Sequence, residues 1–303
     1  MRNEEYQSWR HQKERGSFFL VKAMVWIVKN TRHFIVELLL YPICTYFLIF
    51  SRNARNASYS YLSRILDKPP KLRQRFHHFY VFSQTLVDRV FFNSNEFDDH
   101  YIEVSGGDIV EKYVQEGRGC LLLGSHLGSF DLVKIYGEQF RNVSIKILMD
   151  ENMSPGTTTL FQSLDNKYLD NVIPVGTPGS ILKIKELLSE GGILGILGDR
   201  VFDSQKSVRC KFLGKEASFP TGPILLAGIL QVPIILFFGL RNDENNYKIY
   251  FELFSDQIIL NREHRNEEVN KWVEKYVRRL EFYAHLAPYN WFNFFDIWKP
   301  LVK

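Results

Sequence analysis

Apolar and polar positions follow two different patterns along the chain, and the change falls near residue 100. Between residues 58 and 92, apolar side chains recur at steps of three and four, which predicts amphipathic helices broken at Pro69 and Pro70. From residue 102 onwards, short apolar runs alternate with amphipathic segments. The runs predict strands at 120–124, 143–149, 172–175, 193–197, 233–240 and 247–254, and the segments predict helices at 130–140, 157–169, 180–189, 223–230 and 267–282. This alternation indicates an α/β domain with a mostly parallel central sheet flanked by helices.

The most apolar stretch of the chain lies at residues 34–50. Its 17 residues are at the lower edge of the length needed to cross a bilayer, and they include Glu37 and Pro42. A cleaved secretory signal is not expected, because this run starts late and no small-residue cleavage site follows it. Two interpretations remain open. One is a membrane anchor or interfacial hairpin, with attachment to one leaflet favoured over a span, and the other is a buried helix of a soluble protein.

Charge is unevenly distributed, although the net charge is only +4. Residues 1–90 hold 15 Lys and Arg against 6 Asp and Glu, a net +9, whereas the remainder carries −5. A basic region around an apolar stretch favours an anionic membrane surface as partner. Nucleic acid is not expected, because no helix-turn-helix, zinc-finger or RNA-recognition signature accompanies the charge. The sequence therefore predicts a membrane-anchoring segment at 1–57, rich in basic and apolar residues, and an α/β domain at 58–303.

Several classes of protein are excluded or disfavoured by composition. A mean hydropathy of −0.18 excludes a polytopic membrane protein. The three cysteines are far apart and show no metal-ligand spacing, which argues against a disulfide framework or a metal site. The adjacent His77 and His78 point to different faces of a predicted helix, so they do not form a joint metal site. No P-loop or dinucleotide fingerprint occurs, and no cofactor is expected.

The segment GCLLLGSHLGSFD at 119–131 is the strongest candidate for a functional site. It places His126 just beyond a predicted strand, at the edge where open α/β sheets carry their sites. With His126 in the turn and Asp131 in the first turn of the next helix, the carboxylate can hold one ring nitrogen and leave the other free as a base. The alternative is a loop histidine beside an aspartate that favours a helix start. The serine-hydrolase elbow G-x-S-x-G is absent.

Two later segments carry further candidates. Asp199 and Arg200 follow the predicted strand at 193–197, which puts an acid and a guanidinium at the same edge of the sheet. Phe219 and Gly222 belong to FPTGP, whose shape suits a backbone turn against a ligand before an apolar helix.

Together these blocks resemble the lysophospholipid acyltransferase superfamily. The resemblance rests on a strand, H-x-x-x-x-D, a strand ending in Asp-Arg, an F-P-x-G turn and a V-P-I strand. Within the superfamily, the stretch at 41–62 and the ending APYNWF at 287–292 look most like the branch of lipid A biosynthesis lauroyl and myristoyl transferases. The block FPTGP lacks the glutamate and arginine of the F-P-E-G-T-R found in glycerophosphate-type members. This difference argues against a simple glycerophospholipid acceptor.

The resemblance implies transfer of a fatty acyl group from an acyl carrier protein or coenzyme A thioester to a hydroxyl of a lipid or glycolipid. It also implies a location at the cytoplasmic face of the bacterial inner membrane. His126 would take the proton of the acceptor hydroxyl, and Asp131 would orient the ring and stabilise the imidazolium. The developing oxyanion would be bound by backbone N–H groups between Gly124 and Ser129 or by Arg200.

Other roles and functions stay open at this point. Arg200, Arg209 and Lys211 are candidates for binding phosphates of the acceptor or of the carrier's pantetheine arm, and a solvated surface cation is the alternative for the last two. A thioester hydrolase that uses the same pair on water is a neighbouring hypothesis. A non-catalytic lipid-binding scaffold is a third hypothesis, which the intact His126 and Asp131 disfavour.

Overall fold

The computed structural model describes residues 26–27, 30–31, 33–92, 102–137, 145–149, 171–177, 179–201, 206–242, 244 and 246–299. Its centre is a seven-stranded sheet in the order β1-β9-β8-β2-β5-β3-β4. The strands are β1 (Ile102–Ser105), β2 (Cys120–Gly124), β3 (Ile145–Met149), β4 (Val172–Pro174), β5 (Ile193–Leu197), β8 (Ile234–Arg241) and β9 (Tyr247–Ser255). All neighbouring strands are parallel except β8 and β9. The mixed α/β fold with a mostly parallel sheet is therefore confirmed.

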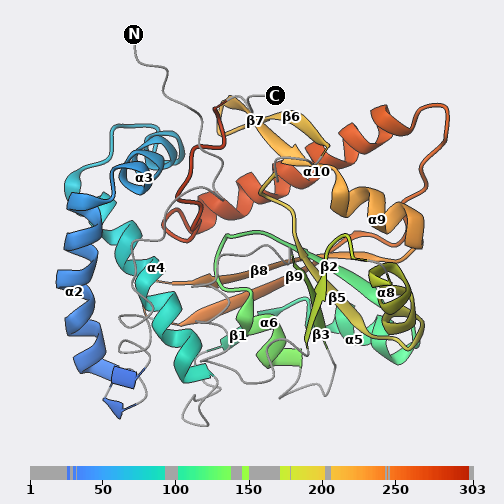
Figure 1. Cartoon of the computed structure of the whole chain (residues 1–303), viewed down its shortest axis with the longest axis horizontal. Helices are drawn as coiled ribbons and strands as arrows, with labels where there is room; N and C mark the ends of the chain where they lie inside the picture. Colours follow the sequence, from blue (N-terminus) through green and yellow to red (C-terminus); the bar gives the residue numbers. More distant parts are fainter. Residues whose placement is uncertain are drawn as a thin grey trace.

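Helices flank the sheet, as Figure 1 shows. They are α5 (Gly107–Gln115), α6 (Asp131–Ile135), α8 (Ser180–Ser189), α9 (Gly222–Leu230) and α10 (Arg265–Leu286). Each face of β2 packs into a different apolar cluster, with Leu121 and Leu123 on one side and Cys120 and Leu122 on the other. Because a strand covered on both faces needs apolar residues at every position, the unbroken run CLLLG is the sequence signal of this central strand.

The structure adds elements that the sequence pattern did not predict. An antiparallel hairpin of β6 (Ser207–Phe212) and β7 (Lys215–Pro220) lies between β5 and α9. Phe219 and Pro220 therefore end a strand, and the predicted ligand-binding turn is reduced to Thr221. The short strand β1 and helix α5 were also not predicted. The predicted helix at 157–169 lies outside the described residues.

Three helices lie together at one end of the sheet: α2 (His33–Phe50), α3 (Arg52–Ile65) and α4 (Leu72–Phe92). One stripe of α2, spaced by four residues, packs on α4 in a separate apolar cluster, through Val36, Leu40, Cys44 and Leu48. The predicted segment boundary between residues 57 and 58 falls inside α3. Among the described residues, no single helix is long and apolar enough to span a membrane. The segments Ile35–Phe50 and Arg52–Ile65, which meet at an angle of 94°, reach the length and composition of a span only when they are taken together.

Candidate functional site

The carboxyl ends of β2 and β5 bring His126 and Asp199 together. These strands are parallel neighbours in a register that pairs Gly124 with Leu197. His126 and Asp199 each lie two residues beyond this pair, so they leave the sheet edge at the same level. The site therefore follows from strand order and register.

Asp199 holds His126 through two hydrogen bonds. The ring Nδ1 lies 2.8 Å from Oδ1, and the backbone N–H of His126 donates to Oδ2 at 2.9 Å. An ionised carboxylate only accepts hydrogen bonds, so the proton of a neutral ring sits on Nδ1 and Nε2 carries the lone pair. Nε2 takes part in no hydrogen bond found among the described residues, and 26% of the His126 side chain is exposed. This nitrogen is therefore placed to accept a proton.

The surroundings keep both partners in the states that a base needs. Burial lowers the pKa of His126 below its usual value, and the positive charge of Arg200 lowers it further, against the opposing effect of Asp199. Burial alone would raise the pKa of Asp199, but the charges and hydrogen bonds of His126, together with Arg200, bring this pKa below its usual value. At neutral pH the pair is thus a carboxylate and a neutral imidazole.

The structure corrects the predicted partner of His126. Asp131 begins α6 and forms an ion pair with Arg89 of α4, with 2.6 Å between Oδ1 and Nη2. The turn between His126 and Asp131 crosses β8 before α6 starts, since the N–H of Ser129 donates to the carbonyl of Gly239. That path turns the ring towards β5 and the aspartate towards α4. The carboxylate that holds the ring is therefore Asp199, and a catalytic role for either residue stays a prediction.

A C-terminal segment that sequence reasoning left without a role fixes this turn from the other side. The N–H of Phe292 donates to the carbonyl of His126, and the N–H of Gly128 donates to the carbonyl of Asn290, both at 2.8 Å. Gly128 has a φ of 80°, and an added Cβ would lie 2.0 Å from the carbonyl oxygen of Gly239. Only glycine fits this close approach. The turn is thus clamped between β8 and the segment at 290–292.

Trp291 was also missed, although it completes the set of donors around Asp199. Its indole Nε1–H donates to Oδ2 at 3.0 Å, and its side chain is fully buried. A buried tryptophan usually finds a partner for its N–H, so the Trp in the non-helical NWFN after a long helix was a usable signal. Because Trp291 and Asp199 are 92 residues apart, the sequence did not indicate that Asp199 is the acceptor.

Arg200 lies beside the pair and is held by the same C-terminal segment. Its Nε donates to Oδ1 of Asn293 and its Nη2 to the carbonyl of Phe292, both at 3.2 Å. Burial lowers the pKa of Arg200 to about 10, which leaves it charged at neutral pH. Since a guanidinium only donates, the Asn293 oxygen must face it and the amide Nδ2 must point away. Nδ2 is buried and has no hydrogen-bond partner among the described residues.

Two of the remaining predicted site residues, Gly124 and Ser129, flank His126 along the chain, whereas Phe219 and Gly222 belong to β7 and α9. Gly124 ends β2, and its carbonyl accepts hydrogen bonds from the Tyr276 hydroxyl and from the N–H of Gly198. Ser129 is buried, and its hydroxyl has no partner within the described part of the chain. Phe219 is fully buried in the core, so its side chain offers no surface to a ligand in this conformation. Gly222 starts α9, where an added Cβ would meet open space.

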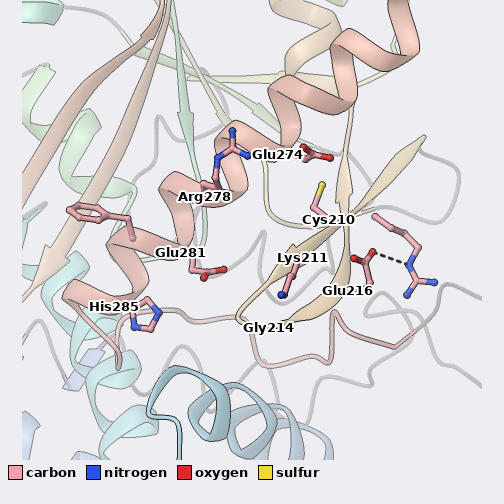
Figure 2. A pocket seen from close by; sticks show the side chains of 10 residues that line it. Cys210, Lys211, Gly214, Glu216, Glu274, Arg278, Glu281 and His285 are labelled. Carbon is pink, nitrogen blue, oxygen red and sulfur yellow. Dashed lines mark ion pairs between the residues drawn. The ribbon is translucent and has the colours of Figure 1, made fainter.

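Arg209 and Lys211 line a separate cleft of about 750 Å³ between the β6–β7 hairpin and α10. Figure 2 shows side chains of α10 facing those of the hairpin across it. The cations share the cleft with Glu216, Glu274 and Glu281, and Arg209 pairs with Glu216 at 4.0 Å. No residue of the His126 site lines this cleft. The structure therefore does not bring Arg209 and Lys211 to the catalytic candidates. In the described part of the chain, no group of three or more His, Cys, Asp or Glu side chains could hold a metal ion.

Fold and site together define an α/β protein with an oriented histidine at the carboxyl edge of its sheet. The family model for bacterial lipid A biosynthesis acyltransferases matches residues 4–299. The chain therefore belongs to this family of acyltransferases, and the resemblance seen in the sequence is confirmed. A comparison with curated proteins found no match.

Proposed function

We propose that the protein moves a fatty acyl group from an acyl-carrier-protein or coenzyme A thioester to a hydroxyl of a lipid or glycolipid acceptor. The observation that carries the proposal is the Nε2 of His126, which has no hydrogen-bond partner in the described part of the chain and whose other ring nitrogen is bound by the buried carboxylate of Asp199. Membership of the lipid A acyltransferase family supports the acyl transfer. The donor, the acceptor and the role of His126 belong to the proposal.

In the proposed mechanism, Nε2 takes the proton of the acceptor hydroxyl as its oxygen attacks the thioester carbonyl. The tetrahedral intermediate then collapses, the carbon–sulfur bond breaks, and the leaving thiolate receives the proton from the imidazolium. Asp199 stabilises the imidazolium in between, because its carboxylate already accepts the Nδ1 hydrogen. No metal or cofactor enters any of these steps.

We further propose that Arg200 and Asn293 bind negative charge on the substrates. Arg200 supplies a guanidinium next to Asp199, and Asn293 supplies a buried N–H donor that Arg200 itself orients. Buried donors aimed at a developing oxyanion are the usual source of electrostatic stabilisation in acyl transfer.

We expect Arg200→Lys to lower kcat/KM by about tenfold, because lysine keeps the charge but loses the planar fork that holds Asn293 and Phe292. Steady-state kinetics of folded protein measure this loss. Arg118→Lys is a matched control: Arg118 pairs with Glu116 and Asp256 and precedes the amino end of β2, at the opposite edge of the sheet. Wild-type kinetics in Arg200→Lys would reduce Arg200 to a structural residue.

Membrane attachment through α2 is the second part of the proposal, with the cytoplasmic face of the bacterial inner membrane as the location. Large apolar and aromatic side chains of α2 are exposed: Ile35, Leu38, Leu39, Tyr41, Tyr46, Phe47, Ile49 and Phe50. The ring of Tyr41 also packs on Phe76 and Tyr80 of α4. Arg55, in the first turn of α3, lies close to the end of α2, where its guanidinium donates a hydrogen bond to the carbonyl of Ile49. An apolar face with aromatic and basic neighbours is typical of a helix that lies in the membrane interface.

We expect the double substitution Leu38→Asp with Ile49→Asp to release most of the protein from liposomes that contain acidic lipid. These side chains are 67% and 56% exposed, so aspartate is tolerated by the fold but not by an apolar interface. Leu182→Asp with Ile259→Asp is the control, because these side chains are 71% and 74% exposed and lie on α8 and between β9 and α10. Equal sedimentation of the two variants with liposomes would place the attachment elsewhere.

The proposed reaction is tested by measuring free thiol released from acyl-CoA or acyl carrier protein, with and without a lipid acceptor. We expect release only when an acceptor is present. Release without an acceptor would support a hydrolase, and no release with any donor would support a non-catalytic lipid-binding scaffold.

A further inference from the structure

We propose that Trp291 and His78 are positioning residues for the pair of His126 and Asp199. Together they form a hydrogen-bonded chain from the N-terminal helices α3 and α4 to the sheet edge. The inference rests on the proposed function, because it assigns these residues to the same site. It adds that α4, on which the helix with the exposed apolar side chains packs, also sets the geometry of the site.

The first link of the chain joins Trp291 to Asp199. Oδ2 of Asp199 accepts two hydrogen bonds, one from the indole N–H of Trp291 at 3.0 Å and one from the backbone of His126 at 2.9 Å. This arrangement leaves Oδ1 for the imidazole. Removing the indole N–H leaves the His126 backbone as the remaining donor to Oδ2. The carboxylate is then less firmly held against rotation about its Cβ–Cγ bond, and the orientation of the imidazole is less strictly fixed.

The second link joins Trp291 to α4 and α3. The backbone carbonyl of Trp291 accepts a hydrogen bond from Nε2 of His78 at 2.9 Å. A carbonyl cannot donate, so the ring proton is on Nε2, and Nδ1 must accept from the Ser58 hydroxyl at 2.9 Å. Burial lowers the pKa of His78 to about 4, and the ring is therefore neutral at any pH where the enzyme would work. Each group in the chain has one defined donor or acceptor role.

The position of Trp291 in the backbone makes this chain relevant to the site. Trp291 pairs with Leu127, the residue after His126, as an isolated antiparallel bridge. The same residue thus touches the turn through its backbone and Asp199 through its side chain. The ring of Tyr61, on α3, packs against the Trp291 ring with 4.9 Å between the ring centroids, and this contact helps to hold the indole in place.

Loss of the Trp291 hydrogen bond should change the pKa of His126 in a defined direction. A donor that shares Asp199 withdraws negative charge from the carboxylate, so losing it strengthens the attraction between Asp199 and the imidazolium. The pKa of His126 should then rise. Within the described residues, the other charged or titratable groups that face the pair are Arg200, just beyond β5, and Tyr276 on α10. Neither is changed by the substitutions below.

The first experiment compares Trp291→Phe with Trp298→Phe in the full chain. Trp298 is a buried neighbour, with 6.0 Å between the two ring centroids, and its indole N–H donates to the carbonyl of Phe212. Both substitutions remove one indole N–H and the same volume from one aromatic cluster, but only Trp291 contacts Asp199. We expect Trp291→Phe to lower kcat by about tenfold with little change in KM. The acid limb of its pH–rate profile should move to higher pH by about half a pH unit to one pH unit, because the lost hydrogen bond raises the pKa of His126.

The second experiment tests the remote link and does not need Trp291 to be replaced. His78→Leu removes both hydrogen bonds, whereas the amide of His78→Gln can donate to the Trp291 carbonyl and accept from Ser58. We expect the leucine variant to shift the pKa of His126 in the same direction as Trp291→Phe, and the glutamine variant to restore most of the wild-type value. His77→Leu, on the neighbouring position of α4, should leave this pKa unchanged.

Histidine ring ¹⁵N NMR reads the tautomer and pKa of His126 without any substrate, with its signal assigned from His126→Gln. Failure of the positioning proposal is therefore distinguishable from failure of the proposed function. A wild-type protein without acyl transfer would overturn the function, while the NMR comparison still decides the positioning. An unchanged pKa and Nδ1–H tautomer of His126 in folded Trp291→Phe, or in folded His78→Leu, would overturn the positioning role.

Discussion

We expect His126→Ala to lower kcat by about a hundredfold to ten-thousandfold, the usual loss when a positioned proton acceptor is removed. The physical reason is the geometry of the ring: Nδ1 is bound by Asp199, and Nε2 has no hydrogen-bond partner among the described residues, which leaves it available to the acceptor hydroxyl of the proposed reaction. Among the other histidines whose side chains the structure describes, His78 is fully buried with both ring nitrogens bonded, and His264 and His285 lie on or beside α10. The ring of His77 packs on that of Tyr289, with 4.6 Å between their centroids. Steady-state acyl transfer, normalised to folded protein, measures the loss.

His285→Ala is the matched control for this substitution. His285 lines the separate cleft beside the β6–β7 hairpin, so its loss should leave kcat near that of the wild type. Folding and liposome binding of His126→Ala should change little, because the side chain lies at the sheet edge rather than in an apolar cluster. Turnover within a few-fold of wild type in folded His126→Ala would overturn its role as the base.

All strands of the central sheet except the short β1 were predictable, because burial leaves a strong pattern in the sequence. The predicted strand at 193–197 and the predicted helix at 180–189 coincide with β5 and α8. The β6–β7 hairpin was missed because one side of each strand is exposed, which gives SVRCKF and KEASFP a weak alternation of apolar and polar residues. The antiparallel pairing of β8 with β9 has no signature in either strand alone, because a buried strand reads the same in both directions.

The position of the candidate site in the fold was predictable, but the partner of His126 was not. His126 was found because it follows a buried strand, and Asp131 was chosen because it is near in sequence. Asp199 was recognised as an acid at the same edge, but its contact with His126 depends on β2 and β5 being neighbours, which only the sheet order provides. Trp291 and Asn293 come from a segment without regular structure. For such a segment, periodicity predicts neither position nor partner.

The same limit applies to the N-terminal helices. The apolar run at 34–50 predicted α2, but it is apolar on all sides, so the pattern alone did not distinguish the stripe that packs on α4 from the face that is exposed. Nor does the sequence indicate that α4 is tied to the body of the protein by polar contacts. Asp88 accepts hydrogen bonds from Arg241 and Tyr247, and Arg89 pairs with Asp131. Contacts of this kind between distant segments depend on the assembled fold.

We expect Asp199→Asn to lower kcat by about a thousandfold to ten-thousandfold, as large a loss as that from removing the base itself. An amide cannot stabilise the imidazolium as a carboxylate does. Its NH₂ group can also donate to Nδ1, which moves the ring proton to Nε2 and blocks the nitrogen that must accept the hydroxyl proton. The acid limb of the pH–rate profile should move to lower pH, because losing the negative charge lowers the pKa of His126.

Asp131→Asn is the decisive comparison, because it makes the same chemical change in the aspartate that is nearer in sequence. This substitution weakens the ion pair with Arg89 and the favourable charge at the start of α6, which should lower the free energy of unfolding by about 1 kcal/mol. The folded fraction should turn over within a few-fold of wild type, since Nδ1 of His126 is still held by Asp199. The double variant His126→Ala with Asp199→Asn should be no slower than His126→Ala, because the orienting group has nothing left to orient. A larger kcat loss in Asp131→Asn than in Asp199→Asn would show that the working enzyme pairs His126 with Asp131 after all.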